Sequence, residues 1–159
     1  MENYDLLVDL YDVKLIPNPN LDIRFVKVLA PDADKVVTYV KDNFRDEWAS
    51  EIKAALYKSN PSCFIAIKDE KIIGFACYDA TAKGFFGPIG VSEEARGLGV
   101  GTTLVQMTLL SMLEDGYAYA IIGGPSVKVH DFYRKACSKV LVIPDSRKIY
   151  LRMIRKINR

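Results

Sequence analysis

The sequence predicts a mixed α/β protein whose twisted sheet is mainly antiparallel. Three apolar runs in the middle of the chain, residues 63–67, 71–78 and 85–91, are separated by short polar turns, as in antiparallel strands. Two amphipathic helical segments precede these runs. An apolar helical segment follows them and leads into another short apolar run, which predicts a parallel crossover. We expect about six to seven strands, flanked by helices.

Composition narrows the class of protein. The chain has 159 residues, half of them hydrophobic, which is enough for a packed core. A formal charge of +2 argues against nucleic acid as a partner. The three cysteines lie in apolar stretches, so we expect buried thiols. We expect neither disulfides nor a metal site. We expect a cytoplasmic protein without a membrane partner, because no basic leader and no run of about 20 apolar residues is present.

Residues 1–20 are predicted to be an N-terminal extension that precedes a domain formed by residues 21–159. An acidic, amphipathic pattern over residues 1–16 predicts a helix, and Pro17-Asn18-Pro19-Asn20 ends it. The apolar residues at helical spacing are Leu6, Leu7, Leu10 and Val13. A docking helix and a partly ordered arm are both compatible with this pattern, so the role of the segment stays open.

The next elements follow from periodicity and from helix signals. Residues 22–29 predict a strand because they are rich in β-branched side chains. Pro31 and Asp32 suit the first turn of a helix whose apolar face ends near Phe44. A second helix is predicted over residues 46–58, where apolar side chains recur at helical spacing.

Glycine and proline interrupt the third run of the predicted sheet. Gly87, Pro88 and Gly90 are unusual inside a strand, because proline lacks a hydrogen-bond donor and glycine has no side chain to pack. These residues predict a bulge or a splayed edge within residues 85–91, and bulges are frequent beside functional sites.

The C-terminal half is predicted to continue the alternation of helices and strands. In order, we expect a helix over 102–114 ended by Asp115-Gly116, a parallel strand over 117–122, a helix over 126–137, a hairpin of 140–143 and 149–154, and a basic tail with Arg155, Lys156 and Arg159.

The strongest local signal is the loop Arg96-Gly97-Leu98-Gly99-Val100-Gly101-Thr102, between a strand and a helix. Such a loop presents backbone N–H groups and the positive end of a helix to an anion. Glycines allow close approach, and the arginine adds a charged donor, so a pyrophosphate is the natural ligand. A P-loop would need Lys after the last glycine. In a dinucleotide loop the third glycine comes three residues after the second, whereas here Gly101 comes two residues after Gly99.

At these residues the chain resembles the GNAT family of acyl-CoA N-acyltransferases. The phosphate-binding motif of that family is Gln or Arg, two residues, Gly, one residue, then Gly or Ala, which Arg96, Gly99 and Gly101 match. Ile89-Gly90-Val91 corresponds to the splayed fourth strand of the family, and Phe132-Tyr133-Arg134-Lys135 resembles its aromatic-Tyr-x-Lys helix. The order of predicted elements is also similar. The resemblance implies a GNAT-like sheet that is splayed between strands 4 and 5.

The resemblance also implies a reaction. An N-acetyltransferase of this family transfers an acetyl group from acetyl-CoA, its co-substrate, to an amine that attacks the thioester directly. Residues 96–102 would bind the pyrophosphate, and Ile89, Gly90 and Val91 would face the pantetheine arm and the oxyanion. Tyr133 would protonate the departing thiolate. The family pattern implies no metal.

Some positions depart from the family pattern. Residues 85–91 contain no acid to serve as general base, which leaves Asp79, His130 or a water chain as candidates. The family's usual Asn and Gly-Phe are replaced by Ser126 and by Cys137-Ser138. A non-catalytic acyl-CoA-binding sensor is therefore the alternative function.

The acceptor is expected to be a small-molecule or peptide amine. Phe44, Arg45 and Trp48, between the first two predicted helices, are candidates for lining its pocket. The sequence identifies neither the acceptor nor whether the chain forms a homodimer.

Overall fold

The computed structural model describes residues 3–154, which form a seven-stranded sheet in the order β2-β3-β4-β5-β6-β1-β7. The strands are β1 (Leu6–Asp9), β2 (Arg24–Lys27), β3 (Cys63–Lys68), β4 (Lys71–Tyr78), β5 (Phe85–Val91), β6 (Tyr119–Ile122) and β7 (Val140–Val142). Neighbouring strands are antiparallel except β5 and β6, which are parallel. The predicted fold class, a mixed and mainly antiparallel sheet flanked by helices, is confirmed.

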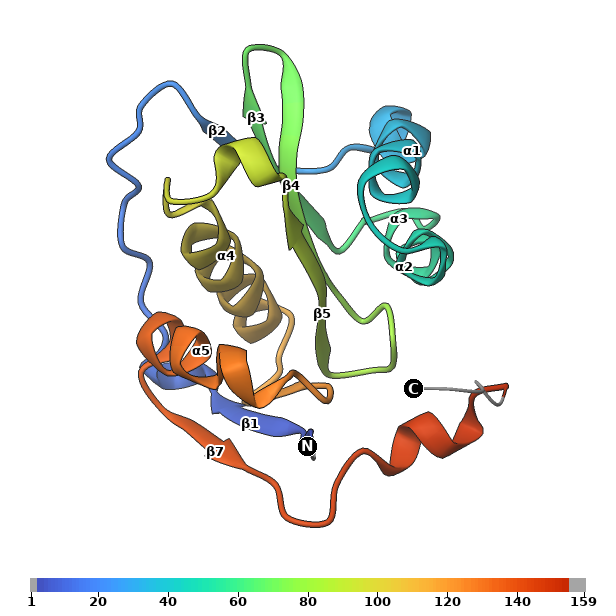
Figure 1. Ribbon diagram of the computed structural model, residues 1–159, viewed down its shortest axis with the longest axis vertical. Helices are drawn as coiled ribbons and strands as arrows, with labels where there is room; N and C mark the ends of the chain where they lie inside the picture. Colours follow the sequence, from blue (N-terminus) through green and yellow to red (C-terminus); the bar gives the residue numbers. More distant parts are fainter. Residues whose placement is uncertain (1–2, 155–159) are drawn as a thin grey trace.

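Helices cover both faces of the sheet, with α1 to α3 on one side and α4 and α5 on the other (Figure 1). The α-helices are α1 (Ala33–Asn43), α2 (Asp46–Glu51), α3 (Lys53–Leu56), α4 (Val100–Glu114) and α5 (His130–Cys137). Short 3₁₀ turns are η1 (Leu10–Asp12), η2 (Ala30–Asp32), η3 (Glu93–Ala95), η4 (Val127–Val129) and η5 (Lys148–Arg152). The helix predicted over residues 46–58 is divided at Ile52 into α2 and α3. Among the described residues, no helix is both long and apolar enough to cross a bilayer.

Strand alternation divides the core into two layers. In β3, Cys63 and Ile65 pack toward the cluster beneath α1 to α3, whereas Phe64 and Ala66 pack toward α4. Because successive side chains of a strand point to opposite faces, a strand covered on both faces must be apolar throughout. Each fully buried aliphatic side chain contributes about 1.5–3 kcal/mol to stability. The two apolar layers therefore hold the central strands, and β5 among them, in place.

The predicted bulge and splay both occur in β5. Between the pairs Ala76–Ile89 and Tyr78–Phe86, β5 contains one residue more than β4, which is the definition of a bulge. β5 pairs with β6 only at Phe85 and Phe86. From Gly87 onward, the edge of β5 that faces β6 is therefore open.

The helix predicted for residues 1–16 is wrong, because Leu6–Asp9 is strand β1, inserted between β6 and β7. Leu6 and Val8 are both fully buried, and Leu7 between them faces the other side of the sheet. This period of two was masked by apolar residues that also fit a helical spacing. Hydrogen bonding to two neighbouring strands outweighs the weak local preference for a helix.

The strand predicted over residues 149–154 is also wrong, because Lys148–Arg152 is the 3₁₀ turn η5. The place beside β7 that a C-terminal hairpin would have filled belongs to β1. The chain after β7 is held instead by Asp5, whose carboxylate accepts the Arg147 N–H at 2.8 Å. The predicted basic tail, with Arg155, Lys156 and Arg159, lies outside the described residues.

Candidate functional site

The glycine loop leaves β5 through η3 and turns sharply into α4. Gly97 and Gly99 have φ angles of +84° and +73°, in the left-handed region that favours glycine. Gly99 is the N-cap of α4, and no side chain caps it. The first turn of α4 therefore points its N–H groups out of the protein at this loop.

Six consecutive N–H groups of the loop, those of residues 97–102, donate to no acceptor among the described residues. The first bond of the helix is from the Thr103 N–H to the Gly99 carbonyl oxygen, at 3.2 Å. Arg96 is exposed and forms no ion pair with a described residue. Free N–H groups at a helix N-terminus, beside a guanidinium, form an anion-binding surface.

The carbonyl side of the same loop is held by two residues to which sequence analysis gave no role. Asn18 and Asn20 donate side-chain hydrogen bonds to the Leu98 carbonyl oxygen, at 3.0 and 2.9 Å. The pattern Pro-Asn-Pro-Asn indicates only the end of a local element. A contact with a loop some 80 positions away leaves no signal in a single sequence.

The open edge of β5 presents backbone groups to the gap beside β6. The Ser92 N–H donates to the Ile73 carbonyl oxygen at 2.9 Å, so Ser92, directly after β5, forms a hydrogen-bonded pair with Ile73 of β4. This pair fixes which of the neighbouring residue pairs are hydrogen-bonded. Hydrogen-bonded and non-hydrogen-bonded pairs alternate between antiparallel strands, so Ile89 and Val91 direct their N–H and C=O groups away from β4. Gly90, between them, pairs with β4.

Tyr133 lies on α5, with its side chain 6% exposed. Its ring packs edge-on against Phe86 and Phe132, with centroid distances of 6.2 and 5.1 Å. Its hydroxyl forms no hydrogen bond with a described residue. Within residues 3–154, Thr108 Oγ1 is the one fully buried side-chain oxygen without a hydrogen-bond partner, so the Tyr133 hydroxyl oxygen is not fully enclosed. Burial, and to a lesser degree Cys137, raises the pKa of Tyr133. The phenol therefore stays protonated at neutral pH.

The loop, the end of β5 and the helix of Tyr133 meet at Gly101. A Cβ on Gly101 would lie 3.4 Å from the ring of Phe132 and 3.7 Å from Val91. Phe132 in turn contacts Tyr133. The three segments predicted to form the site, which are far apart in the sequence, are thus brought together around one small residue.

The two side chains considered as a general base both hold local structure. Asp79 accepts hydrogen bonds from the Gly84 N–H at 2.7 Å and from the Tyr117 hydroxyl at 2.8 Å. His130 is 5% exposed, and its Nε2 lies 3.3 Å from the Pro125 carbonyl oxygen. Both side chains already take part in hydrogen bonds within the protein. A water chain remains the third candidate for the general base.

Two of the residues predicted to line an acceptor pocket, Phe44 and Trp48, pack against Phe75 of β4. Phe44 packs edge-on against Phe75 at 5.4 Å, and its centroid lies 5.8 Å from that of Trp48. The Arg45 guanidinium lies 5.6 Å from the centre of the Trp48 ring. This aromatic cluster closes the layer beneath α1 and α2, and its predicted role in acceptor binding stays a prediction.

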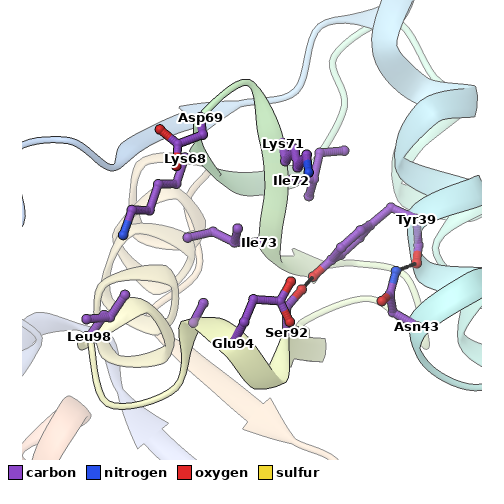
Figure 2. A pocket seen from close by; sticks show the side chains of 11 residues that line it. Tyr39, Asn43, Lys68, Asp69, Lys71, Ile72, Ile73, Ser92, Glu94 and Leu98 are labelled. Atoms are coloured by element: carbon purple, nitrogen blue, oxygen red, sulfur yellow. Dashed lines mark hydrogen bonds between the residues drawn. The ribbon is translucent and has the colours of Figure 1, made fainter.

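A hollow of about 360 Å³ borders the other side of the loop (Figure 2). It is bounded by the β3–β4 hairpin, α1 and η3, and the Tyr39 hydroxyl and Ser92 Oγ lie 2.6 Å apart at its rim. Its charged lining residues are Lys68, Asp69, Lys71 and Glu94. The hollow shares Leu98 with the loop but does not include Tyr133, so it is distinct from the predicted reaction site.

Within residues 3–154, no three His, Cys, Asp or Glu side chains lie close enough together to hold a metal ion.

Three solved acetyltransferase structures resemble this chain at low sequence identity. A GCN5-related glucosamine N-acetyltransferase region of a fungal multi-domain β-N-acetylglucosaminidase matches with a TM-score of 0.71 and 16% identity, over 90% of this chain and 20% of that chain. A GCN5-related N-acetyltransferase from Sphaerobacter thermophilus matches with a TM-score of 0.66 and 18% identity, over 90% and 50%. A GNAT family acetyltransferase from Brucella melitensis, in complex with acetyl-CoA, matches with a TM-score of 0.53 and 20% identity, over 69% and 80%.

These similarities show the fold. The chain spans half or less of the length of the first two proteins. A comparison with curated proteins found no significant match. The profile of the Acetyltransferase (GNAT) family matches residues 31–138, which is more than half of the 159 residues. The chain therefore belongs to the GNAT family of acetyltransferases.

Proposed function

We propose that the protein is an N-acyltransferase that uses acetyl-CoA to acetylate an amine. The observation that carries this proposal is the row of six N–H groups at residues 97–102, beside Arg96, that donate to no acceptor within residues 3–154. Two linked phosphates offer several negatively charged acceptor oxygens to these N–H groups and to the guanidinium of Arg96. Coenzyme A carries such a pyrophosphate, and its acyl arm would extend from the loop along the open edge of β5.

In the proposed reaction the amine nitrogen attacks the thioester carbonyl, and the carbon–sulfur bond then breaks. The N–H groups of Ile89 and Val91 point into the gap beside β6, where either can stabilise the oxyanion. The Tyr133 hydroxyl, which is protonated at neutral pH, donates its proton to the CoA thiolate, and the resulting phenolate regains a proton from the water that accepted the amine proton. General acids of this kind contribute about 10²- to 10⁴-fold to the rate.

The attacking nitrogen must first lose a proton. An alkyl ammonium has a pKa near 10.4, so forming the free amine at neutral pH costs roughly 4–5 kcal/mol. Asp79 and His130 already take part in local hydrogen bonds. Water in the gap beside β5 is the acceptor that this arrangement favours.

Thermal unfolding with acetyl-CoA tests the proposal. At a concentration about 100 times Kd, ligand adds about 2.7 kcal/mol of stability, which raises Tm by roughly 5–10 °C in a chain of this size. Gly99→Glu should abolish the shift, because it places a carboxylate beside the phosphates. Gly116→Glu is the matched control, since Gly116 also has a positive φ, +101°, but lies beyond the other end of α4. A wild-type Tm that millimolar acetyl-CoA leaves unchanged would overturn the proposal.

The second candidate is a non-catalytic acyl-CoA sensor, and the absence of any acid in β5 favours it. Thiol release from acetyl-CoA, measured with a panel of primary amines, distinguishes the two functions. Turnover that Tyr133→Phe reduces supports the enzyme. Binding of acetyl-CoA without turnover by any amine in the panel supports the sensor.

A further inference from the structure

The connector between β1 and β2 runs along the outer side of α4 and past the glycine loop (Figure 1). It is attached by Gln106 of α4, which is 1% exposed. The Ile16 N–H donates to Gln106 Oε1 at 2.9 Å, and Gln106 Nε2 donates to the Ala136 carbonyl oxygen of α5 at 3.1 Å. One buried amide therefore links the connector to both helices that frame the proposed phosphate site.

Beyond this attachment, two asparagines of the connector contact the loop. The Asn18 amide donates to the Leu98 carbonyl oxygen at 3.0 Å and to Thr103 Oγ1 at 3.2 Å. The Asn20 amide donates to the same carbonyl oxygen at 2.9 Å. Its other bond, also 2.9 Å long, is to Asn18 Oδ1, which accepts the Asn20 backbone N–H as well. The two side chains therefore act as one unit on Leu98.

Neither asparagine has an amide hydrogen left for a ligand. A primary amide carries two N–H donors, and both donors of Asn18 and both of Asn20 are already used. The two residues therefore cannot bind a phosphate oxygen through their amides without breaking this network. Their effect on a bound anion must be exerted through the loop.

That effect follows from the planarity of the peptide bond. In a trans peptide the C=O of one residue and the N–H of the next point in opposite directions. The Leu98 carbonyl is held toward the connector, so the N–H of Gly99 points away from it. The Gly99 carbonyl oxygen accepts the N–H and the Oγ1 hydrogen of Thr103, both at 3.2 Å, which in turn directs the Val100 N–H.

We propose that Asn18 and Asn20 are positioning residues for the phosphate-binding loop of this acetyltransferase. They fix the peptide plane between Leu98 and Gly99, so that its N–H faces the pyrophosphate and its carbonyl oxygen faces away. This inference rests on the proposed function. The residues lie outside the segment that the family profile matches, which begins at residue 31.

Calorimetric titration tests the inference by comparing the Kd for CoA of the wild type with that of the Asn18→Ala, Asn20→Ala double variant. We expect Kd to rise by roughly 5- to 30-fold, as follows from the loss of one to two hydrogen bonds that orient a charged ligand. Asn43→Ala is the control, because the exposed Asn43 amide donates to a backbone carbonyl oxygen, that of Tyr39, in α1 and away from the loop. Its Kd should equal that of the wild type.

An amide NMR spectrum distinguishes positioning from general damage. Addition of CoA should shift the Gly99 resonance strongly in the wild type and weakly in the double variant at saturation, while the shifts of Ile89 and Val91 persist. If the wild type binds CoA and the double variant shows the same Kd and the same Gly99 shift, this inference alone is overturned. A wild type that does not bind CoA would overturn the proposed function and this inference with it.

Discussion

The ring of Phe44 occupies the space beside Gly90 in which any other residue would place its Cβ. That atom would lie 2.6 and 2.7 Å from Phe44 Cε1 and Cζ, and 2.8 Å from Phe75 Cε1. Gly90 lies on β5 between the two residues whose backbone faces the open edge. The aromatic layer beneath α1 therefore sets how far β5 can move toward the helices.

Gly90→Ala should destabilise the protein by about 1–3 kcal/mol, the usual cost of overpacking a well-packed site. Gly90 does not have a positive φ, so the cost is steric rather than conformational. Denaturant unfolding measures the change. Phe44→Leu, combined with Gly90→Ala, should make the loss smaller than the sum of the single losses. Additive losses would show that the two residues do not compete for the same space.

Leu6→Ala and Leu7→Ala form a matched pair that tests the N-terminal strand. Leu6 is fully buried, whereas Leu7 is only partly buried on the opposite face of β1. Leu6→Ala should cost about 2–5 kcal/mol of unfolding free energy. Leu7→Ala should cost clearly less. Equal and small losses in denaturant unfolding would contradict the insertion of β1 into the sheet.

Most of the fold could be predicted from local patterns, because strands β2 to β6 and the helices between them form from neighbouring segments. Lys68-Asp69-Glu70 indicated a hairpin, and the structure has positive φ at Asp69 and Glu70, as a tight hairpin turn requires. The two ends of the chain were mispredicted, because residues 6–9 form a strand and residues 148–152 form a 3₁₀ turn. β1 pairs with β6 and β7, more than a hundred positions away, and four residues carry too little periodicity to reveal such a pairing.

The candidate site could be proposed from the sequence to the extent that it consists of contiguous motifs. The glycine loop and residues 89–91 form local patterns whose chemistry follows from backbone geometry. Asn18 and Asn20 both donate to the distant Leu98 carbonyl oxygen, and no spacing rule connects them to that residue. The sequence did not decide between Asp79, His130 and water as general base, because that choice depends on which groups the fold has already paired.

Tyr133→Phe should lower the rate of acetyl transfer by about 10²- to 10⁴-fold without weakening acetyl-CoA binding. Stability should change little, because the Tyr133 hydroxyl bonds to no described residue. The raised pKa of Tyr133 also predicts that the wild-type rate does not fall near pH 10, where an ordinary phenol would lose its proton. Thiol release measured from pH 7 to 10.5 checks both statements. A variant as active as the wild type would remove Tyr133 from the mechanism.

The three cysteine thiols should not react with a disulfide reagent such as DTNB while the protein is folded. Cys63, Cys77 and Cys137 are free and buried. Burial raises the pKa of Cys77 well above its ordinary value and that of Cys137 to about 12, which lowers the fraction of reactive thiolate. Three thiols should appear in denaturant. Rapid reaction of the native protein would contradict this packing, and would also compromise thiol-release assays.

Tyr78 should make the stability of the protein fall above pH 10. It is 1% exposed, and its hydroxyl bonds to Asp115 and Ser111. Burial, followed by the hydrogen bond to Asp115, raises the pKa of Tyr78 to about 12. The unfolded chain then releases the phenolic proton first, so this contribution is complete below pH 10 and is lost between pH 10 and 12.

Urea unfolding of the wild type and Tyr78→Phe, compared between pH 8 and 11.5, tests this assignment. The stability advantage of the wild type over the variant should shrink as the pH rises above 10. The other tyrosines titrate in both proteins, so their effect cancels in the difference. An advantage that stays constant over this range would show that the Tyr78 phenol titrates normally.

A crystal structure with CoA bound tests the central claim most directly. We expect pyrophosphate oxygens within about 3.2 Å of N–H groups of residues 97–102, which is hydrogen-bond distance, with the acyl arm beside Ile89 and Val91. CoA bound elsewhere, with these N–H groups left to solvent, would contradict the account.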